Sequence, residues 1–551
     1  MTNSPKWDLS SLYRLDSSER DHDLAELRRR RAAFGAYTDI LRQRVPTKEE
    51  FAALIREMAA LIALDANLSG FADLLFSEDT SNLKAQALMA ASREESAELA
   101  NEFLFFEIWW QKLAPDLADE FLASLPEFAY YLTRARALLP HTLSEGEEKV
   151  INLKDANGRY ALVELYDSLV SRYVFDGTKI PGASQETLNG EELMVYVRSP
   201  KAETRAGAYQ EFYRIYKNDG PILSQIYRAL VRDYRQEQVR LRRYASPLHS
   251  RHMSNDLPPE TVASLLRVCE SEAPKVFGRY FQVKAKALGL NKLRRYDIYA
   301  PIGEDLGQWS FAEGLDLVLE SFREFDPSWG RLAQAVVDNQ RLDASSRPQK
   351  RRGAFCASLT PDQTPWVLMT YNGKTQDLFT LAHELGHAIH SQLAKEQNIL
   401  QFHACLPLAE SASTFGEMLL AKKLLSQSSP EVKKALTFHL LDDAYATVSR
   451  QAFFAMFEVK VHELIESGAT TEEIAEAYYA SLKEQFGENV ELSPEFRWEW
   501  VSIPHFYHVP FYVYAYSFGQ LLVYSLWRVY EREGPALVQK LTRLLARGGS
   551  A

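Results

Sequence analysis

Two histidines and a glutamate within five residues offer the clearest chemistry in this sequence. His383 and His387 are four positions apart, and Glu384 directly follows the first histidine. On an α-helix this spacing puts both imidazoles on one face, about 6 Å apart along the axis. One zinc ion can bind both rings, because imidazole nitrogens coordinate Zn²⁺ at about 2.0–2.1 Å. The glutamate can take a proton from a water whose pKa the metal lowers toward about 7, so the pattern predicts metal-assisted hydrolysis.

The residues around this motif predict the helix that it needs. Gly373 interrupts the preceding segment, and Thr375 is expected to cap the helix. Apolar residues then recur at helical spacing on a stripe that excludes both histidines: Leu378, Leu381, Ala382, Leu385 and Ile389. A chance match is the alternative interpretation of such a pattern. A similar segment, residues 462–466, lacks the second histidine and is expected to be a solvated helix face.

A catalytic zinc site needs a third protein ligand and one open position. His390 is unsuitable, because about 10 Å of helix rise separates it from the first histidine. Downstream, Pro407 can open a second helix whose small residues allow close packing, so that Glu410 faces the metal. Glu417, two turns further on, can bind the ion instead or orient a ligand histidine from behind, and Asp377 is a second candidate for that orienting role. We therefore predict Glu410 as the ligand and keep the other two carboxylates as supporting candidates.

These segments together resemble a known family. Residues 383–390, with 408–413 after them and 365–373 before them, are similar to the thimet-type zinc oligopeptidases, and within them to the oligoendopeptidase F group. Further similar segments extend the resemblance almost from end to end: 7–13, 295–301, 347–356 and 503–516. The resemblance implies His383, His387 and Glu410 as ligands of one zinc ion per chain and Glu384 as the general base. It also implies a mainly α, multi-lobed helical zincin fold that encloses a substrate channel, with a small β element beside the zinc helix.

A tyrosine-rich segment near the C-terminus is the second candidate for function. Residues 508–527 carry no Asp, Glu, Lys or Arg and would just span a bilayer. A proline, a glycine and four tyrosine hydroxyls argue against a membrane helix, so a buried aromatic segment is the plain alternative. Neutral Tyr and His donors can also stabilise the oxyanion of peptide hydrolysis. In the similar family this segment supplies such donors, which implies His505 and Tyr512, with His508 as an alternative to the first histidine.

The domain organisation is expected to be continuous, without flexible linkers. No Gly/Ser/Pro-rich linker and no repeat divides the 551 residues. We expect an N-terminal helical region over residues 1–115, an oligopeptidase F-type domain over 116–195 and a zinc peptidase domain over 196–551. Few segments have strand patterns. One of them, residues 367–371, is expected to offer a sheet edge that pairs with an extended peptide.

Composition limits the partners and the compartment. A net charge of −11 argues against a nucleic-acid-binding protein, which needs a basic face. The first residues lack the apolar stretch of a signal peptide, and the three cysteines contain no C-x-x-C pair. We therefore expect a reduced, cytoplasmic protein that acts on oligopeptides and binds neither nucleic acid nor membranes.

The sequence favours a zinc metalloendopeptidase that cleaves short peptides. Two alternatives remain open. A metallo-carboxypeptidase or aminopeptidase on the same scaffold would need a charged clamp for a substrate terminus, and no residue identifies itself as one. A catalytically silent zinc protein or peptide carrier would keep the ligands but would not need the base Glu384.

Overall fold

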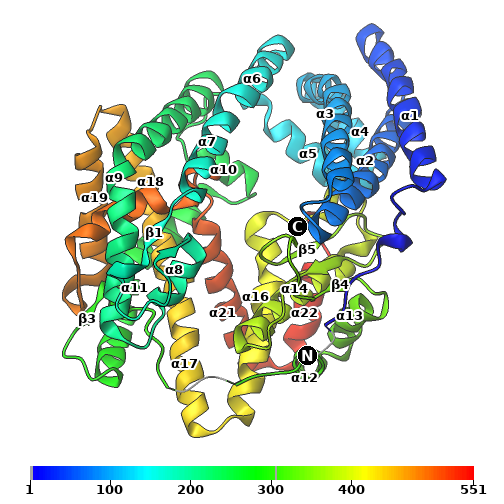
Figure 1. Cartoon of the computed structure of the whole chain (residues 1–551). Helices are drawn as coiled ribbons and strands as arrows, with labels where there is room; N and C mark the ends of the chain where they lie inside the picture. Colours follow the sequence, from blue (N-terminus) through cyan, green and yellow to red (C-terminus); the bar gives the residue numbers. More distant parts are fainter. Residues whose placement is uncertain (1–3, 304–306, 551) are drawn as a thin grey trace. The chain divides into compact units, whose positions relative to one another are not determined.

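The computed structural model describes residues 4–303 and 307–550, and most of them lie in α-helices (Figure 1). The chain divides into two compact units, each assembled from separate stretches of sequence. The first unit contains Met1–Glu145, Gly307–Ser426 and Val523–Ala551; the second contains Gly146–Leu306 and Gln427–Leu522. These units group residues by proximity in space. The boundaries expected near residues 115 and 195 concern sequence families and stay a prediction.

The first unit opens with a group of helices and continues with a small sheet and the helices that cover it. Its helices are α1 (Ser18–Gln43), α2 (Lys48–Glu78), α3 (Leu83–Lys112), α4 (Pro115–Ser124), α5 (Ala129–Ala137), α12 (Phe311–Phe325), α13 (Pro327–Asp338), α14 (Thr375–Leu393), α15 (Ile399–Phe402), α16 (Leu406–Gln427) and α22 (Pro535–Leu545). Sequence signals mark their ends: Thr47 and Glu50 form a capping box at the start of α2.

The sheet of this unit has three short strands, β4 (Leu342–Asp343), β5 (Phe355–Ala357) and β6 (Trp366–Leu368), in the order β4-β6-β5. β6 pairs with β4 in parallel and with β5 in antiparallel register. Trp366 and Leu368 join the apolar core of the N-terminal helices. Side chains alternate along a strand, so Val367 points to the opposite face, where α14 packs. The sheet therefore connects the N-terminal helices to the helix that carries both histidines.

α2 is the one helix of the described residues that is long and apolar enough to cross a membrane. In the structure it packs against its neighbours α1 and α3, and it contributes Phe51, Ile55 and Leu61 to the core with no exposed area. Core helices of folded domains can have the same length and apolar composition, so these two properties are weak evidence for a membrane span.

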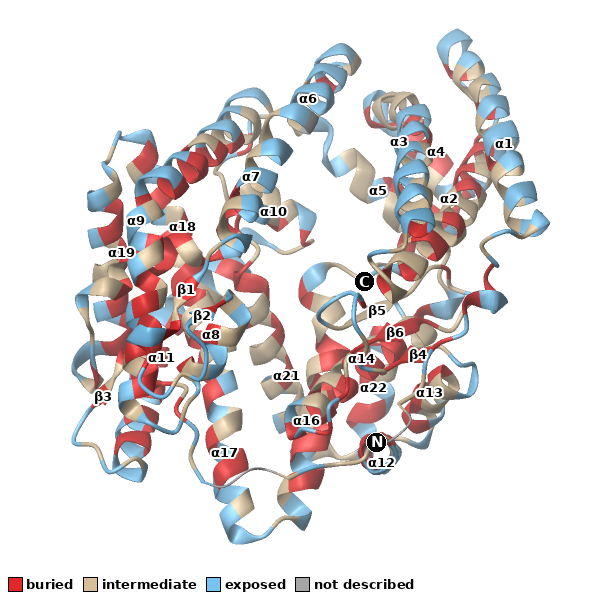
Figure 2. Ribbon diagram, in the orientation of Figure 1, coloured by how far each residue is buried: buried red, intermediate tan, exposed pale blue. Residues whose placement is uncertain are grey.

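The second unit is almost entirely helical. Its helices are α6 (Glu145–Asn157), α7 (Arg159–Ser171), α8 (Gly190–Val197), α9 (Ala202–Tyr234), α10 (His249–Ser254), α11 (Pro259–Ala287), α17 (Pro430–Ala444), α18 (Gln451–Glu466), α19 (Thr471–Phe486) and α20 (Pro504–His508). The first residue of α6, Glu145, is grouped with the first unit. Two short strand pairs accompany them: β1 (Phe175–Asp176) with β2 (Thr187–Leu188), and β3 (Leu293–Arg294) with β7 (Val490–Glu491). Buried residues mark the sides of α9, α11 and α18 that form its core (Figure 2).

Residues 508–527 are not one continuous helix. They comprise the end of α20, a turn, and the first two-thirds of α21 (Tyr514–Glu533), which belongs partly to each unit. Phe511, Val513 and Tyr514 are buried, so much of the segment is core, as the plain alternative predicts. The fold is thus mainly α with a small β element beside α14, as expected.

Candidate active site

The start of α14 is fixed by a carboxylate. The Asp377 side chain accepts hydrogen bonds from the backbone N–H groups of Asn372 (2.7 Å) and Lys374 (3.0 Å). The helix begins at Thr375, and the capping residue is Lys374, one position before the residue expected from sequence. Asp377 thus satisfies amides at the helix start. A role for it behind the ligand histidines stays a prediction.

The predicted apolar stripe of α14 is buried as its spacing requires. Leu378, Leu381, Ala382, Leu385 and Ile389 have no exposed area. On another face α14 meets α16 at backbone distance: a Cβ atom on Gly386 would lie 2.6 Å from Ser413 Cα, and one on Gly416 would lie 2.9 Å from the carbonyl oxygen of Ala382. The small residues therefore permit the close helix contact that the sequence predicts. This contact brings Glu410, in the second turn of α16, to the histidines.

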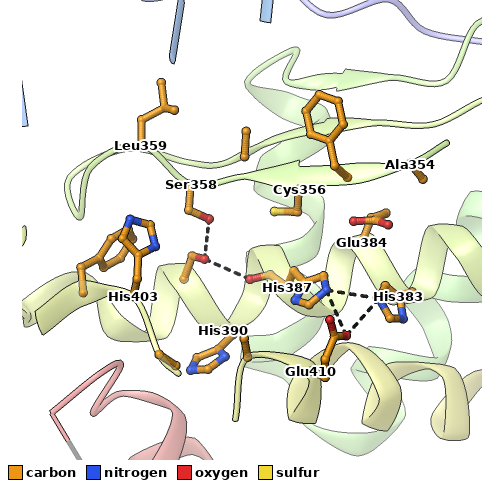
Figure 3. A pocket seen from close by; sticks show the side chains of 16 residues that line it. Ala354, Cys356, Ser358, Leu359, His383, Glu384, His387, His390, His403 and Glu410 are labelled. Carbon is orange, nitrogen blue, oxygen red and sulfur yellow. Dashed lines mark hydrogen bonds and ion pairs between the residues drawn. The ribbon is translucent and has the colours of Figure 1, made fainter. Parts of the chain in front are cut away.

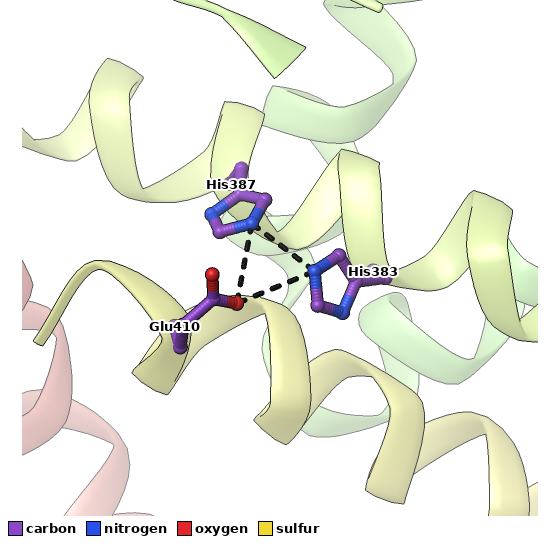
Figure 4. A group of neighbouring side chains, drawn as sticks. All are labelled: His383, His387 and Glu410. Atoms are coloured by element: carbon purple, nitrogen blue, oxygen red, sulfur yellow. Dashed lines mark hydrogen bonds and ion pairs between the residues drawn. The ribbon is translucent and has the colours of Figure 1, made fainter. Parts of the chain in front are cut away.

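His383, His387 and Glu410 lie together (Figure 4). The Nε2 atoms of the two histidines are 3.2 Å apart, and Glu410 Oε2 is 3.3 Å from the first and 3.5 Å from the second. Three donors bound tetrahedrally at zinc distances would be separated by about 3.3–3.4 Å. Two imidazole nitrogens and a carboxylate oxygen in this triangle thus fit one zinc ion in both chemistry and spacing.

Side chains behind the triangle orient it. The Glu417 carboxylate pairs with Nδ1 of His383, on the side of the ring away from the triangle. Ser413 Oγ donates to Glu410 Oε2 at 3.0 Å. A carboxylate on the second nitrogen fixes the tautomer of a ligand histidine. This contact suits Glu417 to orient His383, which is one of the two roles that the sequence leaves open for it.

The electrostatics of the site favour an ionised Glu410 and a weakly acidic Glu384. Burial alone would raise the pKa of Glu410, but its hydrogen bond with His383 and the nearby imidazoles lower that pKa to about 2. Burial raises the pKa of Glu384 to about 7. Burial also lowers the pKa of His387 to about 4, so this ring is neutral near pH 7 and free to coordinate a metal. Glu384 is 6% exposed, next to the triangle but outside it.

A cavity of about 570 Å³ opens beside these residues (Figure 3). One wall is the segment from Ala354 to Leu359, which contains β5, and another is α14 with Glu384. Residues 402–404 complete the end away from His383, where His403 is seen. His390 also lines the cavity, and burial lowers its pKa to about 4. His390 is absent from the triangle, as the helix rise predicts.

The prediction that residues 367–371 offer a sheet edge is wrong. The strand of this segment, β6, is the middle strand of the sheet and is paired on both sides. Among the strands that the structure describes, β5 pairs with β6 alone, and it lines the cavity. The free edge beside Glu384 therefore belongs to residues 355–357. Sequence pattern identifies a buried strand such as Trp366–Leu368, but strand order depends on long-range pairing.

In the second unit, His505, Tyr512 and Tyr516 form a cluster. The rings of His505 and Tyr512 are nearly parallel, with centroids 6.0 Å apart, and His505 Nε2 lies 3.2 Å from the Tyr516 hydroxyl. The rings of Tyr512 and Tyr516 meet edge to face at 4.9 Å. Burial, together with the charge of Arg450, lowers the pKa of His505. Tyr516, in the first turn of α21, was not predicted as a site residue; Tyr512 precedes that helix, so helical spacing gives no signal for the pair.

His508 points elsewhere. Its Nε2 is 2.9 Å from Oδ1 and 3.1 Å from Oδ2 of Asp167, on α7. The structure thus separates the two histidines that the sequence left interchangeable: His505 lies with the tyrosines, and His508 lies with a carboxylate. The 462–466 segment also differs from expectation, since His462 is 1% exposed and lies against Phe511 and Tyr234 rather than in solvent.

Comparisons with known proteins show the family of this chain. The Peptidase family M3 profile matches residues 195–551, and the Oligopeptidase F profile matches residues 109–175. An oligoendopeptidase F homolog of Lactococcus lactis is 26% identical over 94% of this chain and 86% of its own length. Oligopeptidase PepF of Bacillus subtilis is 26% identical over 87% of this chain and 72% of its own length.

Solved structures show the same fold. A peptidase structure from Chlamydophila abortus superposes with a TM-score of 0.83 at 24% identity, covering 99% of this chain and 92% of the other. Oligoendopeptidase F of Enterococcus faecium superposes with a TM-score of 0.71 at 22% identity, covering 96% and 91%. The resemblance inferred from sequence is confirmed. The chain belongs to Peptidase family M3 and is a metalloendopeptidase of that family.

Proposed function

We propose that this metalloendopeptidase hydrolyses short oligopeptides with one zinc ion per chain and with Glu384 as general base. The observation that carries the proposal is the triangle of His383, His387 and Glu410 donor atoms, with sides of 3.2 to 3.5 Å, beside the buried carboxyl of Glu384. These three residues would hold the ion. When bound, zinc supplies Lewis-acid chemistry that acidifies water and polarises a carbonyl.

Glu384 moves the proton in this proposal. Its carboxylate takes a proton from the water that attacks the scissile carbonyl and then delivers it to the leaving amine. Burial, which raises the pKa of this carboxyl to about 7, suits it to both steps, because a group that must accept and return a proton works best when its pKa is near the ambient pH.

We further propose that His505 and Tyr512, assisted by Tyr516, stabilise the oxyanion that forms on the carbonyl. A neutral imidazole and phenol hydroxyls are suitable donors for such a charge. The lowered pKa of His505 keeps its ring neutral near pH 7. His508 has the lesser claim, since Asp167 holds its Nε2.

The substrate is proposed to lie extended along β5. No described strand pairs with the other side of β5, which lines the cavity next to Glu384, so main-chain groups of a peptide can add to the sheet there. Recognition through the backbone tolerates many side chains, which suits an oligopeptidase. A cytoplasmic location completes the proposal, supported by the sparse set of three cysteines, which contains no C-x-x-C pair.

The decisive test is Glu384→Gln, because the amide keeps the shape and removes the base. We expect turnover to fall by about 10²–10⁴-fold while zinc content stays at one per chain. Glu396→Gln, at an exposed residue just beyond α14, is the matched control and should leave both unchanged. Retained turnover in the Glu384 variant would refute the assignment of the base.

Cleavage products distinguish the rival activities. Mass spectrometry should find internal cleavage of a short peptide blocked at both ends, little cleavage of a folded protein, and cleavage of its unfolded chain. Failure on the blocked peptide but success on the free one would favour an exopeptidase. Efficient cutting of the folded protein would contradict the enclosed channel that the family resemblance implies. Zinc binding without any cleavage would favour a silent peptide carrier.

A further inference from the structure

The turn that carries Tyr512 has an unusual backbone. Between α20 and α21, Phe511 adopts a φ of +58°, the left-handed region that residues with side chains rarely occupy. Its ring is 1% exposed and lies 4.6 Å from the imidazole of His462, measured between centroids. Such conformations persist only where surrounding contacts hold them, and they cluster at functional sites. The contacts that hold this turn therefore control the position of the next residue, Tyr512.

The backbone N–H of Phe511 donates to Oε1 of Glu458 at 2.8 Å. Glu458 lies in α18, one turn before His462, and is 1% exposed. A buried carboxyl is costly unless a specific contact compensates for it, and here the contact is with the single amide of the left-handed residue. Both Glu458 and His462 meet Phe511, one at its amide and the other at its ring.

Further contacts come from α10 and the residue that follows it. Arg251 Nε donates to the carbonyl oxygen of Pro510 at 3.2 Å. Asn255 Nδ2 donates to the Tyr514 hydroxyl at 2.8 Å. The turn is thus held on each side of Phe511, but Glu458 alone binds the amide of the strained residue among the contacts that the structure describes.

We propose that Glu458 is a positioning residue for the oxyanion cluster: its buried carboxyl holds the left-handed turn at Phe511 and so keeps the Tyr512 ring beside His505. The proposal rests on the proposed role of His505 and Tyr512. Glu458 itself touches neither substrate nor metal. Without its acceptor the Phe511 amide loses its partner, the turn relaxes toward ordinary backbone angles, and Tyr512 moves away from His505.

The experiment compares Glu458→Ala, Glu458→Gln and Glu463→Ala in the full-length zinc enzyme, with a blocked fluorogenic peptide as substrate. Displacement of a catalytic group by about 1 Å can reduce the rate about 100-fold, so we expect a loss in kcat of this order for Glu458→Ala, with KM changed less than about threefold. Glu458→Gln keeps an amide oxygen as acceptor and should restore kcat to within about threefold of the natural enzyme. Zinc content should stay at one per chain in all variants. Glu463 is exposed on the same helix, and its variant is the control.

Amide hydrogen exchange gives a readout that does not depend on activity. Amide exchange at residues 505–516 should be faster in Glu458→Ala than in the natural enzyme and should stay slow in Glu458→Gln. Amide exchange within α18 should be unchanged in both variants. Equal kcat for Glu458→Ala and the natural enzyme, or slow exchange of the Phe511 amide in that variant, would overturn the proposal. A Glu458→Gln variant as impaired as Glu458→Ala would also overturn it. If the alanine variant fails to fold, Glu458→Asp, which withdraws the acceptor by one methylene, must show the same loss of kcat and faster exchange. Inactivity of the natural enzyme on blocked peptides would refute the proposed function instead, and the exchange data would still test the role of Glu458.

Discussion

The helix pair α14–α16 and the segment 504–516 position the side chains of the proposed site by different means. In the first, two histidines four residues apart share a helix face, and glycines let a second helix approach until Glu410 reaches them. In the second, His505 and Tyr512 stand on either side of a left-handed turn that Glu458 and Arg251 hold in place. The first arrangement follows from local periodicity, and the second depends on residues distant in sequence. Variants should therefore separate metal binding from transition-state stabilisation.

The largest effect is expected from Glu410→Ala. Removal of one of the three proposed ligands leaves two histidines with little affinity, so zinc content after dialysis should fall far below one per chain and activity should disappear. Glu417→Ala removes only the partner of His383 Nδ1 and should weaken zinc affinity about 10–100-fold. Metal analysis at graded zinc concentrations measures both. A larger loss in Glu417→Ala than in Glu410→Ala would make Glu417 the ligand.

Changes in the second region should spare the metal. Loss of one oxyanion donor typically costs about 10²–10³-fold in kcat, which we expect for His505→Ala and for Tyr512→Phe. His508→Ala should cost less than about tenfold, because its ring is engaged by Asp167. Steady-state kinetics with parallel metal analysis test this order. If His508→Ala is the more damaging histidine variant, the two residues exchange roles.

The same contrast explains how far the sequence predicts this molecule. Residue spacing and size predict three features of α14 and α16. The apolar residues from Leu378 to Ile389 form a buried stripe, His383 and His387 lie together off that stripe, and α16 packs closely against the helix. The sheet edge at β5 does not, because a strand pattern carries no information on strand order. The contacts of His508 with Asp167 and of Phe511 with Glu458 join residues hundreds or tens of positions apart, and the left-handed Phe511 has no glycine to announce it.

The pH dependence of kcat/KM should reflect the titration of Glu384, which lies in the first region. A protonated Glu384 cannot accept a proton, so kcat/KM should fall about tenfold per pH unit below its pKa. Burial raises this pKa from 4.5 to about 7, and a bound cation opposes that rise, so the acidic limb should lie between these values. His505→Gln should lower the rate at every pH without moving the limb, because Glu384 and not His505 carries the titrating proton in the proposed mechanism. A limb that moves with His505→Gln would assign the titration to the second region.

The smallest effect tests the backbone contact on which the metal triangle depends. Gly386→Ala keeps every ligand but puts a Cβ 2.6 Å from Ser413 Cα and 2.7 Å from the Ala412 carbonyl oxygen, so α14 and α16 must separate. Overpacking of this kind typically costs about 1–3 kcal/mol, and we expect the free energy of unfolding to fall by that amount, with weaker zinc binding. Gly35→Ala, in α1, is the matched control: nothing lies within 4 Å of its added Cβ, and alanine in a helix interior should stabilise by about 0.5–1 kcal/mol. Urea unfolding of the metal-free and zinc-bound proteins measures both variants. Unchanged zinc affinity in Gly386→Ala would mean that the triangle forms without the close contact, and the comparison with the segment 504–516 would then lose its basis.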